Sequence, residues 1–222
     1  AGINLKKNIL MGGSFRAIIM VFSFFSSLIT ARYLGVELKG EYNYLITLGS
    51  FLWTLLDLGI YRSYPYLIRK FPNKINNLFK WATLTFIIEI VVLSSTGLLL
   101  INFWSKVLSY NFKPIYMLLF IGYMTFSKYF MQLESIFMGM DRIVDQSIGD
   151  LLYGGLTFLL FLIGFIFLHN VDRLAVILVG MVIAMGIGIA YFIKQYNKVD
   201  FAKNLDLKFI YSAYSFGIRV FL

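Results

Sequence analysis

The sequence contains no cysteine, a single histidine and only three prolines. The absence of cysteine excludes disulfide bonds, cysteine–metal sites and thiol catalysis. The single histidine, His169, falls at the end of an apolar stretch, and we interpret it as a solvated helix cap rather than a catalytic base. The sequence also shows no glycine-rich nucleotide-binding loop and no nucleophile beside a base. We therefore expect no catalytic residues, no metal site and no enzyme.

Charged residues are also scarce, since they make up 14% of the 222 residues, whereas 59% are hydrophobic and 18% are aromatic. A helix of about 20 apolar residues spans a hydrocarbon core of about 30 Å, because it rises about 1.5 Å per residue. Six apolar stretches of this length follow one another: Ile9–Tyr33, Tyr42–Tyr61, Trp81–Trp104, Ile115–Met140, Ser147–Leu168 and Leu174–Ile193. The pattern predicts an all-α, polytopic bundle of transmembrane helices.

Two other origins of the apolar stretches are excluded. Helices of a large soluble domain would each carry a polar face, but Leu174–Ile193 contains no charged residue. A signal peptide would be shorter than Ile9–Tyr33 and would not be followed by further apolar stretches. The chain is therefore expected to stay in the membrane.

The connections between the stretches are short, and the longest is Arg62–Lys80. It contains Pro65 and Pro72, which are typical of a turn region between helices. We interpret Tyr64 and Trp81 as aromatic anchors at the membrane interface. None of the connections is long enough for a soluble catalytic domain.

The 20 Lys and Arg residues outnumber the 11 Asp and Glu residues and give a formal net charge of +9. If the N-terminus is cytoplasmic, twelve basic residues fall in inside regions, five in outside loops and three within apolar stretches. Because basic residues concentrate in cytoplasmic loops, this bias predicts a multi-pass protein of the cell membrane with a cytoplasmic N-terminus. The positive charge reflects topology and attraction to anionic lipid headgroups. We expect the lipid bilayer, and not nucleic acid, as its partner.

Polar residues inside the apolar stretches recur at helical spacing. In the second stretch they draw one stripe along a helix face: Asn43, Thr47, Ser50, Thr54, Asp57 and Tyr61. Shorter stripes occur in the first stretch and in the fourth: Arg16, Ser23, Ser27 and Thr30, and Thr125, Lys128, Gln132 and Ser135. Packing between helices is the ordinary explanation for the Ser and Thr positions. The stripes predict three helices with a side that faces protein or water.

Ionisable residues within the stretches are more informative, because each costs about 2.5–3.5 kcal/mol to place at the centre of a membrane. The cations are Arg16, Lys128 and Arg219, and the acids are Asp57, Glu89, Glu134 and Asp150. Buried ion pairs, for example between Arg16 and Asp57, would satisfy these charges without a ligand. A water-filled vestibule that ends near Lys128 would instead attract an anionic headgroup. The sequence leaves both interpretations open.

Three short runs of residues carry a resemblance to a known family. The runs are Ala31-Arg32-Tyr33-Leu34-Gly35 followed by Glu37, Gly40 and Tyr42, then Leu55-Leu56-Asp57-Leu58-Gly59-Ile60-Tyr61-Arg62, then Gly139-Met140-Asp141-Arg142. Together they resemble the N-terminal half of the polysaccharide flippases, the O-antigen and repeat-unit translocases of the multidrug/oligosaccharidyl-lipid/polysaccharide exporter superfamily. Two positions depart from the family pattern, because Val36 replaces the usual proline and Lys39 an aromatic residue.

The resemblance implies a transporter of twelve to fourteen helices, built of two six-helix lobes around a cationic cavity that opens to each side in turn. Residues 1–197 would form the N-terminal six-helix lobe. Residues 198–222 would form a cytoplasmic linker and the truncated start of helix 7, which opens near Phe209 and is cut off at Leu222. The missing C-terminal lobe of the same chain would be the partner of this one.

The substrate that the resemblance implies is a polyprenyl-(pyro)phosphate that carries a sugar repeat unit. Because phosphate binds cations, Arg16 and Lys128 are the candidate headgroup contacts, with Arg219 behind them. Hydroxyl and amide groups bind sugars, and the candidates are Asn43, Thr47, Ser50 and Gln132. The candidates for a coupling H⁺ or Na⁺, or for pairing the cations in the empty state, are Asp57, Glu89 and Glu134. No other cofactor is expected.

Three alternatives remain. A cation-coupled multidrug exporter of the same superfamily would carry more acid than base at mid-depth, where Lys128 stands in this chain. A membrane-embedded enzyme that acts on lipid-linked sugar would need a large extramembrane loop with acidic or histidine residues. A scaffold subunit without transport activity would have little use for charges inside the membrane.

Overall fold

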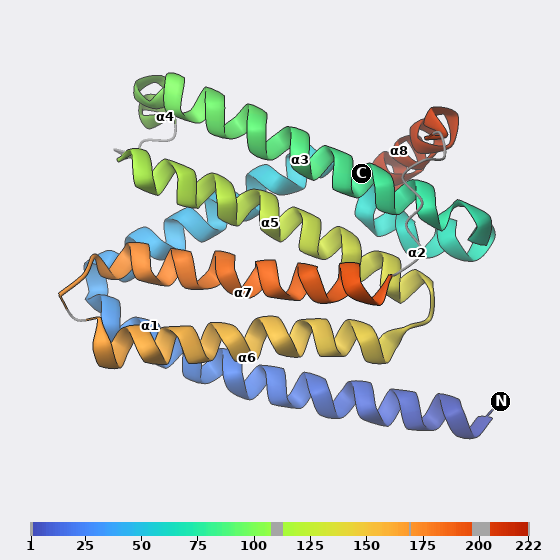
Figure 1. Ribbon diagram of the computed structural model, residues 1–222, viewed down its shortest axis with the longest axis horizontal. Coiled ribbons are helices and arrows are strands. Elements are labelled where there is room, and N and C mark those ends of the chain that lie inside the picture. The colour runs from blue at the N-terminus through green and yellow to red at the C-terminus, as the bar shows by residue number, and fades with distance from the viewer. Residues whose placement is uncertain (1, 108–112, 169, 197–204, 222) are drawn as a thin grey trace.

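The computed structural model describes residues 2–107, 113–168, 170–196 and 205–221, and within these ranges it contains helices and no strand. His169 lies outside the described residues. The elements follow in chain order (Figure 1): α1 (Gly2–Asp57), α2 (Ile60–Lys70), the 3₁₀ helix η1 (Pro72–Lys74), α3 (Ile75–Leu99), α4 (Ile101–Val107), α5 (Pro114–Gly139), α6 (Ile143–Phe167), α7 (Arg173–Gln195) and α8 (Leu207–Phe221). The predicted all-α fold is confirmed.

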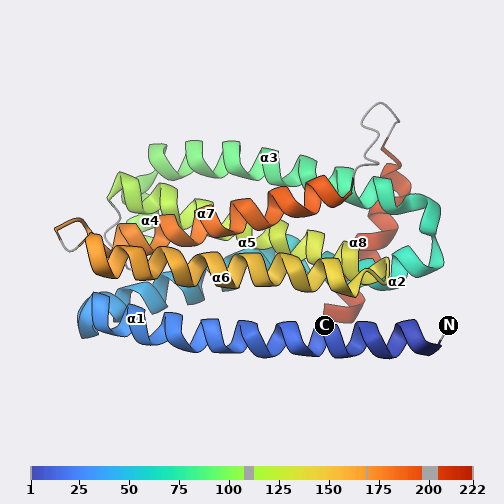
Figure 2. The ribbon, with the colours of Figure 1, turned by 60° about the horizontal axis from the view of Figure 1, so that its bottom comes forward.

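Gly35 divides α1 into two arms, because its backbone leaves the helical conformation (φ 72°, ψ −175°). Glycine adopts this conformation without the strain that a Cβ atom would cause. Residues 2–34 form the first arm and residues 36–57 the second arm, and Figures 1 and 2 show that the arms run in opposite directions. The connection expected between the stretches Ile9–Tyr33 and Tyr42–Tyr61 is therefore wrong, since the helix resumes directly after Gly35.

The turn region predicted at Arg62–Lys80 is shorter than expected, because α2 and the start of α3 occupy most of it and only Phe71 and η1 with Pro72 form the turn between them. α1 ends at Asp57, and the two residues after it, Leu58 and Gly59, both have positive φ angles (50° and 73°). In α2 the buried residues recur at helical spacing: Ile60, Ser63, Tyr64, Leu67 and Ile68. The burial of this face offsets the hydrogen bond that Pro65 removes. Tyr64 is fully buried and is no interfacial anchor.

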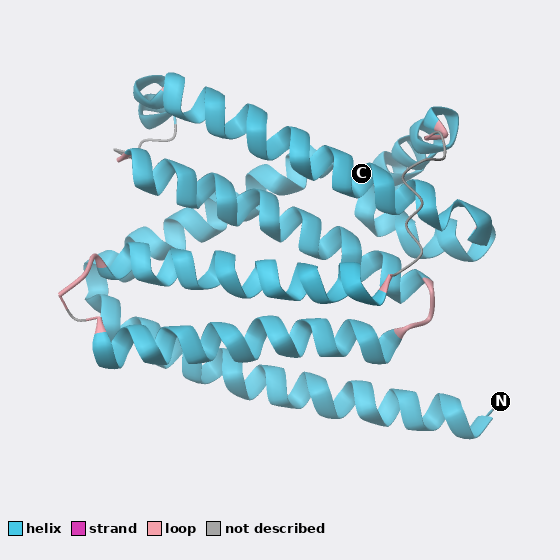
Figure 3. Cartoon of the chain, viewed as in Figure 1, coloured by secondary structure: helices cyan, strands magenta, loops and turns pink. Residues whose placement is uncertain are grey.

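The bundle is built around α5, which packs against α1, α2, α3, α6 and α7 (Figures 1 and 2). α6 lies between α7 and the first arm of α1. The bend of α1 lies at the end of the bundle where α6 ends and α7 begins, and α2 and α8 lie at the opposite end. We call these the bend end and the α2 end. The described loop between α5 and α6 is short, as Figure 3 shows.

The predicted stretches match the later helices well. α5, α6 and α7 each begin and end within a few residues of Ile115–Met140, Ser147–Leu168 and Leu174–Ile193. Trp81–Trp104 is divided instead between α3 and α4. The helix expected near Phe209 is present as α8.

The outside of the bundle is apolar. Phe24, Val91 and Ile163 are 61%, 58% and 48% exposed, and many other large apolar side chains are exposed with them. Soluble monomers rarely expose apolar patches larger than a few hundred Å². Within the described part of the chain, four helical segments are long and apolar enough to span a membrane: Gly12–Asp57, Pro72–Leu99, Ile143–Phe167 and Arg173–Gln195. These helices are those of a membrane protein, whereas the count of six spans and the cytoplasmic N-terminus stay predictions.

α5 is not among these four segments, although it lies in the middle of the bundle. Polar residues such as Lys128 and Gln132 lower its hydropathy, but buried residues occur along its whole length. In the half of α5 nearer α2, Leu133 and Phe137 belong to the largest buried apolar cluster, together with Phe192 of α7. A long helix that falls short of the hydropathy of a membrane span is therefore the centre of the core.

Candidate functional site

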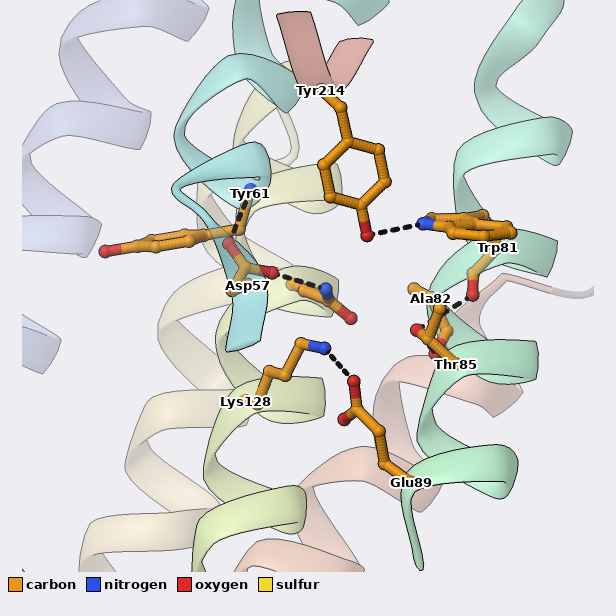
Figure 4. A network of polar contacts seen from close by, with 9 residues as sticks. Asp57, Tyr61, Trp81, Ala82, Thr85, Glu89, Lys128 and Tyr214 are labelled. Atoms are coloured by element: carbon orange, nitrogen blue, oxygen red, sulfur yellow. Dashed lines mark hydrogen bonds and ion pairs between the residues drawn. The ribbon is translucent and has the colours of Figure 1, made fainter. Parts of the chain in front are cut away.

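Four polar side chains meet inside the bundle between α1, α3 and α5 (Figure 4). Lys128 of α5 forms an ion pair with Glu89 of α3, and their side chains are 3% and 17% exposed. Four residues further along α5, the Gln132 Nε2 amide donates a hydrogen bond to Asp57 Oδ1 at 2.6 Å. We call Asp57, Glu89, Lys128 and Gln132 the lysine cluster.

Local helix geometry explains how α5 contributes to this cluster. Lys128 and Gln132 are four positions apart and therefore lie on one face of the helix. The full predicted stripe, Thr125, Lys128, Gln132 and Ser135, is buried. The prediction that this face of the helix meets protein or water is confirmed, and the neighbour is protein.

Asp57 is fully buried at the end of the second arm of α1. It accepts the hydrogen bond from Gln132 and a second one from the Tyr61 backbone N–H to Oδ2 at 3.1 Å. Its position at the break between α1 and α2 places the carboxylate over the first turn of α2, where free backbone N–H groups favour an acid. The ion pair expected between Arg16 and Asp57 does not occur, because Arg16 is exposed on the first arm.

The charges of the lysine cluster do not balance. When both acids are ionised, Asp57 and Glu89 face one ammonium, that of Lys128, so the cluster carries one excess negative charge. Glu89 Oε1 accepts from Lys128, whereas Glu89 Oε2 is buried and has no hydrogen-bond partner among the described residues. A buried oxygen of this kind is costly to leave unpaired. The cluster therefore has room for one proton or one small cation.

Aromatic residues lie beside the cluster at the α2 end. Tyr214 of α8 accepts a hydrogen bond from the Trp81 indole Nε1 of α3 at 3.2 Å (Figure 4). Close packing holds α8 there, because a Cβ atom on Gly217 would lie 2.9 Å from the Ile60 Cα atom of α2. Sequence reasoning missed Tyr214 and treated Trp81 as an anchor only. The helix predicted near Phe209 was the signal in the sequence that could have indicated a further helix beside the lysine cluster.

A second group of polar side chains lies between the first arm of α1, α5 and α6. Gln146 Nε2 of α6 donates to Glu134 Oε1 of α5 at 2.7 Å. Arg16 of α1 is an electrostatic neighbour of Glu134 and of Asp150 on α6. Arg16 is exposed, and the ion pairs formed among the described residues do not include it. We call Arg16, Glu134, Gln146 and Asp150 the arginine cluster.

The remaining candidate residues join neither cluster. Asn43 and Thr47 are exposed on the second arm, and Arg219 is exposed on α8. Ser50 is half-buried, and its Oγ lies 3.3 Å from the Tyr123 hydroxyl oxygen of α5. The predicted stripe on the second arm therefore starts exposed near the bend and ends buried at Asp57.

Two cavities border the second arm of α1. The first, of about 290 Å³, is apolar and lies between the second arm, α3, α4 and α5, with Leu55, Leu93, Trp104 and Phe120 among its lining residues. The second, of about 220 Å³, lies between the two arms, α6 and α7, and most of its lining residues carry a hydroxyl group. Lys128 lines neither of these two cavities, so the vestibule expected to end at Lys128 stays a prediction.

No group of three or more His, Cys, Asp or Glu side chains that could hold a metal ion occurs in the described part of the chain. Comparison with family models, with curated proteins and with solved structures gave no significant match. The fold and the apolar exterior define an all-helical membrane protein with charged residues in its interior.

Proposed function

We propose that this chain belongs to a flippase that moves a polyprenyl-(pyro)phosphate-linked oligosaccharide or polysaccharide repeat unit across the cytoplasmic membrane. Three features support the proposal. The chain is a bundle of apolar helices, it keeps charged groups inside that bundle, and its runs Ala31–Gly35 and Leu55–Arg62 resemble the N-terminal half of the polysaccharide flippases. A transporter of this kind would use a second lobe and alternating access.

The buried Lys128–Glu89 pair beside Asp57 carries the proposal. A buried ion pair contributes little net stability, because desolvation of both charges offsets their attraction. Ionisable residues inside a membrane bundle instead mark substrate or ion pathways as a rule. Lys128 and its two acids are therefore better explained by transport than by packing.

The two clusters support different roles. Arg16 is exposed and outside the ion pairs of the described residues, so its guanidinium is available to a phosphate oxygen without a prior rearrangement. Lys128 is engaged by Glu89 and would reach a phosphate only after Glu89 is protonated or displaced. Binding or release of a proton at Glu89 would thus couple a proton gradient to the headgroup.

The other candidate residues also divide into groups that are exposed and available to a ligand and groups that are already hydrogen-bonded. Asn43 and Thr47 are exposed and are available to sugar hydroxyls, whereas Gln132 holds Asp57 in place. The apolar lining of the cavity beside Leu55 and Leu93 suits part of an isoprenoid chain. Arg219 stays a candidate for a later contact, on the helix that follows the lobe.

Complementation of a host that lacks its own polysaccharide flippase tests the proposal. The complete gene should restore surface polysaccharide, and Arg16→Ala should lower it about tenfold or more, since one lost charge-assisted contact has that size. Arg32→Ala is the matched control, because Arg32 is a second exposed arginine on the same arm. Full transport by Arg16→Ala and Lys128→Ala at normal protein levels would contradict the proposal.

One observation favours a second candidate, the cation-coupled multidrug exporter. The lysine cluster holds two acids and one base, and its buried Glu89 Oε2 lacks a partner among the described residues, so the cluster itself suits a cation better than an anion. Resistance to cationic drugs conferred by the gene, together with failure in several sugar systems, would favour this candidate. Asp57 and Glu89 would then be the substrate-facing acids.

A further inference from the structure

The cavity between the two arms of α1 has features that neither cluster explains. It measures about 220 Å³, and its walls come from both arms, from α6 and from α7 near the bend end (Figure 1). Ser26 and Thr30 of the first arm, Lys39 and Tyr42 of the second arm and Thr157 of α6 line it. It is separate from the lysine cluster, because none of the four residues of that cluster borders it.

Two residues of its lining carry a hydroxyl group that is buried and has no partner among the described residues. Ser26 Oγ and Thr157 Oγ1 form no hydrogen bond with any described residue, and each residue is only 8% exposed. Serine and threonine in helices usually donate to a backbone carbonyl one turn back, as Thr30 does to Ser26 O at 2.9 Å. Buried donors of this kind are costly unless a ligand or water accepts from them.

The only charge on the cavity wall among the described residues is the ammonium of Lys39. Its Nζ donates to Thr30 Oγ1 at 2.9 Å and lies 4.5 Å from the centre of the Tyr42 ring. The ion pairs among the described residues do not include Lys39, and no acidic side chain of the described chain lines the cavity. An ammonium half-buried without a counter-ion attracts an anion.

We propose that this cavity binds a carboxylate group. One ammonium balances one negative charge, and the hydroxyl groups of the lining residues are neutral donors for the carboxylate oxygens, with those of Ser26 and Thr157 reaching the ligand after their side chains rotate toward the cavity. A dianionic phosphate would need a second cation or an arginine fork, and the described lining has neither. The carboxylate can belong to a sugar acid, whose other hydroxyls would use the remaining serines, or to a small organic acid.

Thermal unfolding of the full chain, purified in detergent, tests the proposal without a transport assay. Sodium glucuronate, sodium acetate, glucose and sodium chloride are compared at matched ionic strength, because a ligand that binds only the folded state raises the unfolding temperature. Stabilisation by glucuronate alone identifies a sugar acid, and stabilisation by glucuronate and acetate identifies a general carboxylate site. No shift with either carboxylate, or an equal shift with glucose or chloride, overturns the proposal.

Variants of the lining residues test whether the glucuronate-dependent stabilisation arises from binding in this cavity. Lys39→Gln should abolish the glucuronate-dependent shift, and Ser26→Ala should weaken glucuronate binding about tenfold, as expected for one hydrogen bond to a charged group. Lys113→Gln is the control, since Lys113 also lies over a tyrosine ring, that of Tyr116, but is exposed and does not line the cavity. Unchanged glucuronate binding in Lys39→Gln would place the ligand elsewhere and overturn the proposal.

Discussion

The lysine cluster and the arginine cluster differ in how each holds its cation. Lys128 is buried and paired with Glu89, and Gln132 bridges to the second acid, Asp57. Arg16 is exposed, while Glu134 is held by a neutral amide, that of Gln146. A charge buried in a low-dielectric interior has to be paired, whereas an exposed charge does not.

Because of this difference, the fold requires the charge of Lys128, whereas the charge of Arg16 is available to a ligand. Loss of Lys128 would leave a buried carboxylate, so folding itself depends on this lysine. Loss of Arg16 would leave half-buried acids that already have a hydrogen-bond donor or access to solvent. A substitution of Lys128 should therefore lower stability much more than a substitution of Arg16, whereas either substitution should lower transport.

The largest expected effect on stability comes from breaking the buried pair. Lys128→Met removes the partner of Glu89 and should lower the free energy of unfolding by about 3–5 kcal/mol. The double variant with Glu89→Gln should recover most of this loss, because no unpaired charge remains. Denaturant unfolding in detergent measures both. A single variant as stable as the wild type would show that Glu89 is already neutral.

The next effect concerns Gly35, which joins the arm that carries Arg16 to the arm that ends at Asp57. Gly35→Ala forces a side chain into a strained backbone conformation and should cost about 1–3 kcal/mol. Gly40→Ala is the control, since Gly40 is helical and a Cβ atom there would meet nothing within 4 Å. This control should stabilise the chain by up to about 1 kcal/mol. Equal effects of both substitutions would contradict the role given to the bend.

Arg16→Gln should change the free energy of unfolding by less than about 0.5 kcal/mol, as is usual for exposed residues. Transport should nevertheless fall, because the freely available cation is lost. Unfolding and surface polysaccharide are measured on the same preparations, with Arg32→Gln as the control. If Arg16→Gln destabilised the chain as much as Lys128→Met, the comparison between the clusters would fail.

The smallest effect is a pH dependence outside the membrane helices. The hydrogen bond from Lys74 Nζ at 2.6 Å holds the pKa of Asp206 below its ordinary value. Because the folded pKa is the lower one, the stabilisation is fully present above the unfolded pKa of about 3.9 and is lost as pH falls through the folded pKa. Lys74→Gln should reduce this shift in an NMR titration of the Asp206 carboxyl group, whereas Lys70→Gln should not, and the hydrogen bond from the Phe209 backbone N–H should preserve part of the shift in both variants.

Helix positions were predictable where one physical signal dominated. α5 begins and ends within one residue of the predicted Ile115–Met140, because Pro114 starts the helix and the apolar run has the length of a span. The helix α2 was missed, because Pro65 and Pro72 outweighed its amphipathic spacing in the prediction. The bend at Gly35 was missed since a single residue, rather than a loop, reverses the chain.

For the site, the sequence predicted which helix faces are polar and buried, but not which side chains contact one another. The spacing of Thr125, Lys128, Gln132 and Ser135 correctly indicated one buried face of α5. It contained no information on which helix covers that face, so Asp57 was assigned to Arg16 instead of Gln132. Pairings between distant helices depend on how the bundle packs, and periodicity within one helix does not encode this.

The polarity of α5 has a consequence for how the chain is made. Synthesis proceeds from the N-terminus, so α3 with Glu89 leaves the ribosome before α5 with Lys128. An unpaired lysine at mid-helix costs about 2.5–3.5 kcal/mol to insert into lipid. Pairing with a carboxylate that is already in the membrane offsets part of this cost. The Lys128–Glu89 ion pair therefore also favours one order of membrane insertion, in which α3 is in place before α5.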